Sequence, residues 1–229
     1  MSLLQRYKLL KEAIKNPGRR SSDLFVKYPP ESTFDGKKVL NLGCGKSAYP
    51  AKNVTNLDFL PGPGVEVVWD LSKTPLPFDT NEFDYIIANH VLEHVPNWWE
   101  CFKEMARVLK VGGTIEVWVP PISSDTSFGY RDHINRICNV SFQGTRGSVR
   151  YGGNIWEQND FNNLGFAKDL ELIKYEPHPI LTWWTVLAPF SLYKFMIEHL
   201  RNVVFETGYF FKKLTPLSSF DEYARWGRK

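Results

Sequence analysis

Short apolar runs alternate with polar or glycine-containing segments between positions 37 and 119, and this alternation is the main structural pattern of the chain. Short apolar runs bounded by turn residues are typical of buried parallel strands. The runs that we interpret as strands are Val39–Leu42, Val54–Asp58, Val65–Trp69, Phe83–Ala88 and Ile115–Val119. Residues Trp98–Leu109 instead have helical periodicity, and we expect Gly112 and Gly113 to end that helix.

Strands that alternate with crossover segments predict an open α/β sheet of mostly parallel strands. Two further runs, Leu170–Tyr175 and Val203–Phe211, predict the sixth and seventh strands. Only ten residues separate Gly45 from Asn56, fewer than a crossover with a full helix needs. We therefore expect the first crossover helix to be a stub or absent, and Tyr49 or the N-terminal helix to cover the binding pocket on that side.

The N-terminal segment is predicted to form a short helix that docks on the main body. Its apolar residues Leu3, Tyr7, Leu10 and Ile14 recur at helical spacing, and Asn16-Pro17-Gly18 stops the pattern. We divide the chain into this helix with its connector, residues 1–36, and one main domain, residues 37–229. Within the main domain, residues 37–120 form the cofactor half, and residues 121–229 form the acceptor-binding half.

Composition narrows the class of protein. The chain has 229 residues, 43% of them hydrophobic, and a net charge of only +3, which does not indicate a nucleic-acid partner. Three widely spaced cysteines without a secretory leader favour reduced thiols and a cytoplasmic location. The least charged run, residues 180–193, is shorter than a membrane-spanning helix.

The residues that follow each predicted strand indicate the ligand, because ligands of such sheets bind beyond the carboxyl ends of the strands. These residues are Gly43 to Lys46, Asp58, Asp70 and Asn89-His90. Two glycines allow close backbone approach, and a carboxylate after the second strand can accept hydrogen bonds from both ribose hydroxyls. The loop lacks the third glycine of a dinucleotide site and the spacing of a P-loop. A cofactor with a ribose and no phosphate fits better, and S-adenosylmethionine is the common one.

Six motifs in order resemble class I S-adenosylmethionine-dependent methyltransferases. They are Val39-Leu40-Asn41-Leu42-Gly43-Cys44-Gly45, Asn56-Leu57-Asp58, Asp70 with Leu76-Pro77-Phe78, Phe83-Asp84-Tyr85, His90-Val91-Leu92-Glu93-His94 and Arg107-Val108-Leu109-Lys110-Val111-Gly112-Gly113. The pattern is most similar to small, type 11-like predicted methyltransferases that are often associated with glycan or cell-surface biosynthesis. The resemblance implies a Rossmann-like sheet of seven strands with an antiparallel last strand.

The resemblance also implies roles for matching positions. It assigns the two glycines to the methionine part of the cofactor, Asp58 to the ribose, Asp70 and Leu71 to the adenine, and Asn89 and His90 to the methionine end. The full set of implied cofactor residues is Asn41, Gly43, Cys44, Gly45, Asp58, Phe59, Asp70, Leu71, Asn89 and His90. Ser47 replaces the family's third glycine, and Val111 replaces its proline before the double glycine.

The acceptor site has to come from residues after position 120. Transfer to a hydroxyl requires removal of a proton, and histidine suits that task near neutral pH. The cluster Tyr130-Arg131-Asp132-His133 supplies the candidate base His133, oriented by Asp132 or another acid, with His90 as the rival base. His94 is expected to pack or cap, and Cys44 to be a small filler. The five histidines are scattered, so the sequence predicts no metal ligands.

The sequence therefore predicts an S-adenosylmethionine-dependent methyltransferase that acts on an oxygen or nitrogen of a sugar-containing or other small acceptor. One alternative is a catalytically degenerate binding subunit with this fold. Another is an enzyme that contacts a membrane surface and methylates a lipid-linked acceptor, because aromatic residues between positions 183 and 195 lie near basic residues. Residues 145–153, rich in glycine, are a candidate lid. The loop after the fourth strand lacks the sequence of a DNA amino-methyltransferase, and the oligomeric state stays open.

Overall fold

The computed structural model describes residues 31–142, 169–179 and 204–217, together with residue 11 and the short pieces 189, 191–192, 195–196 and 200–202. The predicted N-terminal helix, the candidate lid and most of the aromatic segment lie outside the described residues. Within the segment, Phe195 is described and has 52% of its surface exposed.

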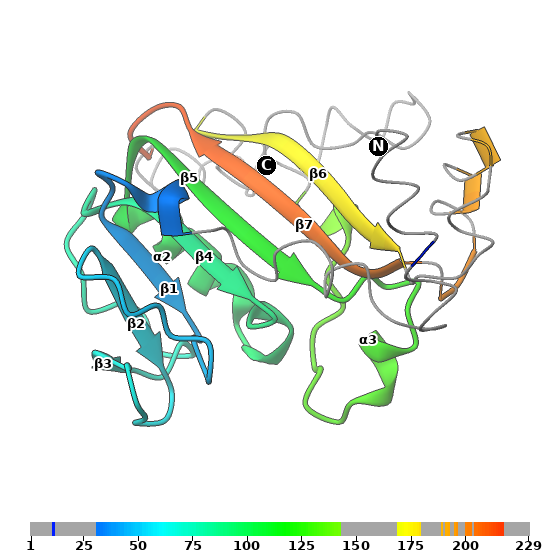
Figure 1. The fold of residues 1–229 in the computed structure, drawn as a ribbon, viewed down its shortest axis with the longest axis horizontal. Helices are drawn as coiled ribbons and strands as arrows, with labels where there is room; N and C mark the ends of the chain where they lie inside the picture. Colours follow the sequence, from blue (N-terminus) through cyan, green and yellow to red (C-terminus); the bar gives the residue numbers. More distant parts are fainter. Residues whose placement is uncertain are drawn as a thin grey trace, which may run out of the picture.

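Seven strands form one sheet in the order β3-β2-β1-β4-β5-β7-β6. The strands are β1 (Val39–Leu42), β2 (Val54–Asp58), β3 (Val67–Val68), β4 (Phe83–Asn89), β5 (Leu109–Val119), β6 (Leu170–Pro179) and β7 (Val204–Lys213). Strands β1 to β5 pair in parallel, and β7 runs antiparallel to both neighbours, β5 and β6. Figure 1 shows this sheet with its short strands at one end and the long β5, β7 and β6 at the other. The predicted fold class, including the antiparallel last strand, is confirmed.

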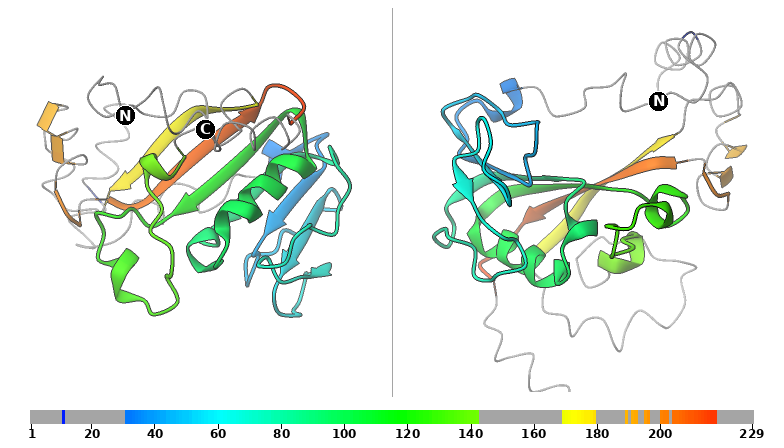
Figure 2. Two further views of the ribbon diagram at one scale, coloured as in Figure 1. Left: turned by 180° about the vertical axis from the view of Figure 1, so that it is seen from behind. Right: turned by 90° about the horizontal axis from the view of Figure 1, so that it is seen from below.

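Helix α2 (Trp98–Val108) covers one face of the sheet (Figure 2). Its buried residues Cys101, Phe102, Met105 and Ala106 pack with alternate residues of the central strands, such as Leu40 and Ile86, in the main core. Alternation of side chains along a strand sends the intervening residues to the opposite face. The remaining helical pieces are η2 (Glu31–Phe34), η3 (Leu92–His94), α3 (Thr126–Gly129) and η4 (Asn139–Phe142). No helix in these described ranges is long and apolar enough to cross a bilayer.

The connection between β1 and β2 contains no helix, as the short spacing predicts. A small second core covers the face of the sheet opposite helix α2. There Phe34 and Tyr49 pack against Val39, Val54 and Ile87. The rings of Phe34 and Tyr49 meet edge to face at 5.1 Å. The expectation that Tyr49 covers the binding pocket is therefore wrong, because this side chain covers the sheet in place of the missing helix.

Gly112 and Gly113 do not end helix α2, contrary to the sequence prediction. The helix ends at Val108, and Leu109 already has extended backbone and pairs with Phe83 in the sheet. The buried Lys213 ammonium donates hydrogen bonds to the carbonyl oxygens of Ala106 and Leu109, at 2.8 and 2.6 Å, at the end of the helix. Because a side chain satisfies these carbonyls, a glycine cap is unnecessary.

The two glycines instead lie within β5, where its register with β4 shifts between Phe83 and Tyr85. Gly112 has φ +85°, and a Cβ on Gly113 would lie 2.9 Å from the Asp84 carbonyl oxygen. The glycines thus allow β5 to bulge and to approach β4 closely. The third strand is also shorter than the predicted Val65–Trp69, whereas β6 extends to Pro179 and β7 to Lys213.

Candidate functional site

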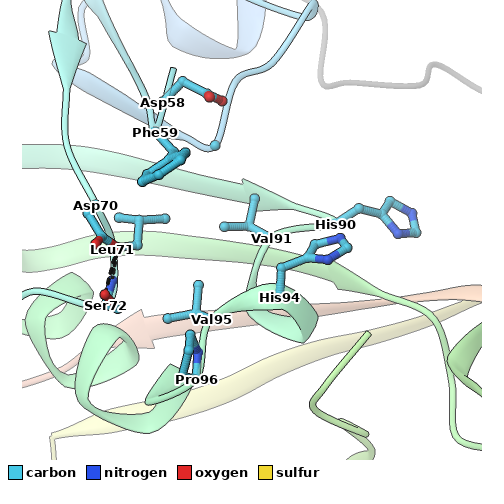
Figure 3. Close-up of a pocket in the computed structure, with 11 residues that line it drawn as sticks. Asp58, Phe59, Asp70, Leu71, Ser72, His90, Val91, His94, Val95 and Pro96 are labelled. Carbon is cyan, nitrogen blue, oxygen red and sulfur yellow. Dashed lines mark hydrogen bonds between the residues drawn. The ribbon is translucent and has the colours of Figure 1, made fainter. Parts of the chain in front are cut away.

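A cavity of about 410 Å³ lies beyond the carboxyl ends of β1, β2 and β4, where the strand order reverses. This is the position at which open α/β sheets bind ligands, and the volume is in the range of small-molecule sites. Its lining residues are Gly43, Asp58, Phe59, Asp70, Leu71, Ser72, His90, Val91, His94, Val95 and Pro96. Figure 3 shows Asp58 with Phe59 and Asp70 with Ser72 on one side, and His90 with His94 on the other.

The Asp58 side chain joins the loop after β1 to the end of β2. Its Oδ2 accepts the Gly45 N–H at 2.8 Å, and its Oδ1 accepts the Leu60 N–H at 3.1 Å. A carboxylate oxygen has two lone pairs, so each oxygen keeps the capacity to accept one more hydrogen bond. The adjacent Phe59 ring is 64% exposed, which leaves a large apolar surface beside this carboxylate.

Gly43 allows the loop to enter the site. It has φ +59°, and a Cβ there would lie 2.5 Å from a methyl group of Val91. Gly45 also has positive φ but has open space around its Cα hydrogens. Cys44 between them is buried, and burial raises the pKa of its thiol to about 11. This thiol stays protonated near neutral pH, which agrees with its interpretation as a filler.

Asp70 forms a local turn on the other side of the cavity. Its Oδ1 accepts the backbone N–H of Ser72 at 2.9 Å and the Ser72 hydroxyl at 2.7 Å. These hydrogen bonds lower the pKa of the Asp70 carboxyl. The carboxylate is therefore ionised at neutral pH. Its hydrogen bonds join Asp70 to Ser72 and so fix the backbone on both sides of Leu71.

Asn41 has a structural position beneath the loop. It is 2% exposed, and its Nδ2 donates to Asn56 Oδ1 at 2.9 Å and to the Ser47 carbonyl at 3.3 Å. Asn41, Cys44, Gly45 and Asn89 do not line the cavity, whereas the six other residues assigned to the cofactor do. The sequence assignment thus separates into residues at the cavity wall and residues that shape the loop behind it.

His90 has φ +54°, and carboxylates hold both of its ring nitrogens. Nδ1 lies 3.1 Å from Glu93 Oε1, and Nε2 lies 2.8 Å from Glu206 Oε2 on β7. Burial alone would lower the pKa of His90, but the hydrogen bonds to Glu206 and Glu93 outweigh it and raise the pKa to about 9. His90 is thus an imidazolium that ties the end of β4 to β7.

The segment after α3 places His133 against His94, and their rings contact at 4.8 Å between centroids. Among the described residues, Asp132 forms no hydrogen bond with the His133 ring. Its carbonyl oxygen lies 2.9 Å from His94 Nδ1, and its carboxylate lies 3.4 Å from the same atom. His133 and Asp132 do not line the cavity, whereas His94 does.

Two residues that line the cavity, Ser72 and His94, had no binding role predicted from the sequence, which assigned His94 to packing or capping. Glu93, buried beside His90, had no predicted role either. Ser72 and His94 follow β3 and β4 within a few residues, so the rule that ligands bind beyond strand ends points to them. Glu93 lies in the same turn as His94, but only its burial beside His90 distinguishes it from a solvated acid.

The part of the chain that holds this site is similar to known methyltransferases. Residues 40–117 match a family model described as a methyltransferase domain. An uncharacterised methyltransferase of Mycobacterium sp. (strain KMS) is 27% identical over 195 residues, covering 74% of this chain and 76% of its own. Demethylmenaquinone methyltransferase of Staphylococcus carnosus is 39% identical over 98 residues, which cover 34% of this chain and 41% of its own.

The chain is also similar in structure to an S-adenosylmethionine-dependent methyltransferase from Mesorhizobium loti. The TM-score is 0.47 at 14% identity, and the superposition covers 77% of this chain and 91% of the other.

Proposed function

Because this chain is a class I S-adenosylmethionine-dependent methyltransferase, we propose that its cavity binds S-adenosylmethionine and that the enzyme methylates an oxygen or nitrogen of a sugar-containing or other small acceptor. The observation that carries the cofactor proposal is the juxtaposition of Gly43, Asp58 and Leu71 around one cavity at the strand reversal. The acceptor class rests on the sequence resemblance.

The cavity wall fits each part of the cofactor. The Asp58 carboxylate would accept the ribose hydroxyls, and the exposed Phe59 ring with Leu71 would contact the adenine. Gly43 would let the methionine part approach the backbone, with His90 at the far end. Both ring nitrogens of His90 already engage Glu93 and Glu206, so His90 would contact the methionine end through the exposed part of its ring and not by a hydrogen bond.

When bound, S-adenosylmethionine would supply a methyl group activated by its sulfonium charge, and the carbon–sulfur bond would break, leaving its electron pair on sulfur, as the acceptor's bond to carbon formed. The protein has to align the acceptor and receive its proton. His90 does not suit the second task because both of its nitrogens already engage carboxylates. Of the two candidate bases from the sequence, we therefore propose His133, with Asp132 acting on it only through His94.

Calorimetric titration with S-adenosylmethionine and S-adenosylhomocysteine tests the cofactor site. Loss of the carboxylate in Asp58→Ala should weaken binding by about 2–4 kcal/mol, more than tenfold, because two ribose hydrogen bonds disappear. Asp58→Asn keeps one acceptor oxygen, so we expect a smaller loss. Asp35→Ala is the matched control, since Asp35 is exposed and does not line the cavity.

Equal affinity of the wild type and Asp58→Ala would refute this cofactor geometry. Binding that is followed by no turnover on any acceptor, beginning with glycans, would instead favour a degenerate binding subunit.

A further inference from the structure

Three groups that can ligate metal meet beside the cavity. Glu93 and His94 belong to η3, directly after β4, and His133 arrives from the segment after α3. One ligand atom from each residue lies within 4.8 Å of the other two. His94 lines the end of the cavity, where Figure 3 shows its ring next to His90. One member of the cluster, His94, therefore faces the proposed methyl-transfer site.

Two buried polar atoms of this cluster have no hydrogen-bond partner. The Glu93 residue is 1% exposed, and its Oε1 bonds to His90 while Oε2 is left without a partner. His133 Nδ1 is likewise buried and without a partner. A buried carboxylate oxygen without a partner is unfavourable, because it has lost its hydration and gained no hydrogen bond in exchange. A cation between these atoms would remove that cost.

Hydrogen bonds around the cluster orient its ligands. The Asp132 carbonyl oxygen accepts from His94 Nδ1, so Nε2 is the nitrogen of that ring that is placed to ligate. His90 holds the Glu93 carboxylate through Oε1, so Oε2 is the oxygen that remains. Such partners of ligating groups fix tautomers and ring orientations in metal sites.

Asn135 joins the two chain segments that supply the ligands. Its N–H donates to the Glu93 carbonyl at 3.0 Å, and its side-chain amide donates to the carbonyls of Leu92 and Val95 at 3.0 and 2.5 Å. These bonds hold the His133 segment against η3 without a metal. The arrangement is therefore preorganised and does not depend on a cation for its assembly.

We propose that Glu93, His94 and His133 bind a divalent transition-metal ion such as Zn²⁺ or Mn²⁺. Two imidazoles and one carboxylate suit these ions, and three protein ligands leave coordination positions open. The next step rests on the proposed function: because His94 lines the cavity, the open coordination positions would take an oxygen of the acceptor. With the ion bound, His133 is a ligand and no longer a base, and the proton of the acceptor hydroxyl passes to water, because the cation lowers the pKa of a hydroxyl that it ligates. This proposal replaces the expectation from sequence that the protein has no metal site.

The test is calorimetric titration of the full metal-stripped chain with ZnCl₂ and MnCl₂, with Co²⁺ absorption spectra to report the ligand set. We expect one ion per chain for the wild type, and affinity at least tenfold weaker in His133→Ala and His94→Ala. Glu93→Gln should weaken binding likewise, and thermal unfolding identifies any variant that fails to fold. Because the histidine variants change partly exposed rings, they keep the test decisive if the buried Glu93 variant unfolds.

Asp58→Ala separates the two proposals. It should lose S-adenosylmethionine binding and keep the metal, whereas His133→Ala should do the reverse. A wild type that binds the metal but not S-adenosylmethionine would leave this inference standing and overturn the cofactor site. No binding of either ion by the wild type, or unchanged binding in both histidine variants, would overturn the metal site.

Discussion

Gly43→Ala and Gly45→Ala together test how the first loop is built. Both glycines have positive φ, +59° and +51°, so alanine at either position carries the cost of the left-handed region, about 1–2 kcal/mol. Only Gly43 faces a neighbour, since its added Cβ would lie 2.5 and 3.0 Å from the two methyl carbons of Val91. Val91 is 7% exposed and β-branched, which limits its ability to rotate away.

The expected losses follow from this geometry. Gly45→Ala should reduce the free energy of unfolding by about 1–2 kcal/mol through backbone strain alone. Gly43→Ala adds overpacking of about 1–3 kcal/mol, for a total of about 2–5 kcal/mol. Because Val91 lines the cavity, its displacement should also weaken S-adenosylmethionine binding in Gly43→Ala.

The assay is urea unfolding followed by tryptophan fluorescence, with equal m-values required for comparison. Val91→Ala removes the two clashing methyl groups, so Gly43→Ala combined with Val91→Ala should recover the overpacking as a favourable coupling of about 1–3 kcal/mol. Losses for Gly43→Ala and Gly45→Ala that agree within about 0.5 kcal/mol, or a coupling near zero, would show that the contact with Val91 is not the constraint.

Two further predictions concern the hydrogen bonds made by helix α2. Arg107 donates to the carbonyls of Leu76 and Phe78 at 3.1 and 3.0 Å, so Arg107→Lys, which loses the fork, should cost about 1–2 kcal/mol of stability in urea unfolding. A loss below about 0.5 kcal/mol would contradict this role. Burial lowers the pKa of Lys213 from 10.5 to about 8, so the folded state binds fewer protons than the unfolded state between these values. Stability should therefore rise by up to about 3 kcal/mol as the pH rises from 8 to 10.5, and Lys213→Met should abolish that slope in pH-dependent unfolding.

The metal and cofactor proposals use different parts of one strand-end surface. Asp58 and Leu71 lie near β2 and β3, whereas Glu93 and His94 follow β4. The single cavity connects them through His90 and Val91. An acceptor oxygen at the His94 end would therefore meet the methyl end of a cofactor whose ribose lies at Asp58.

The sequence by itself determined the strand positions and the identity of the strand-end residues. Apolar runs and their breaks are local patterns, because burial of a parallel strand demands consecutive apolar side chains. The short spacing between Gly45 and Asn56 likewise excluded a full helix there without any knowledge of contacts. These features locate Gly43, Asp58 and His90 at one edge of the sheet, since all parallel strands end on the same side.

Only the tertiary structure decided which partner each side chain takes. Glu206 reaches His90 across 116 positions of the chain, and Lys213 caps a helix that ended more than a hundred residues earlier. Because of such a long-range cap, the helix needs no glycine, and Gly112 and Gly113 are used for a bulge in β5 instead. Glu93 and His133 meet for the same reason: packing sets which distant segments touch, and a local pattern carries no information about that choice.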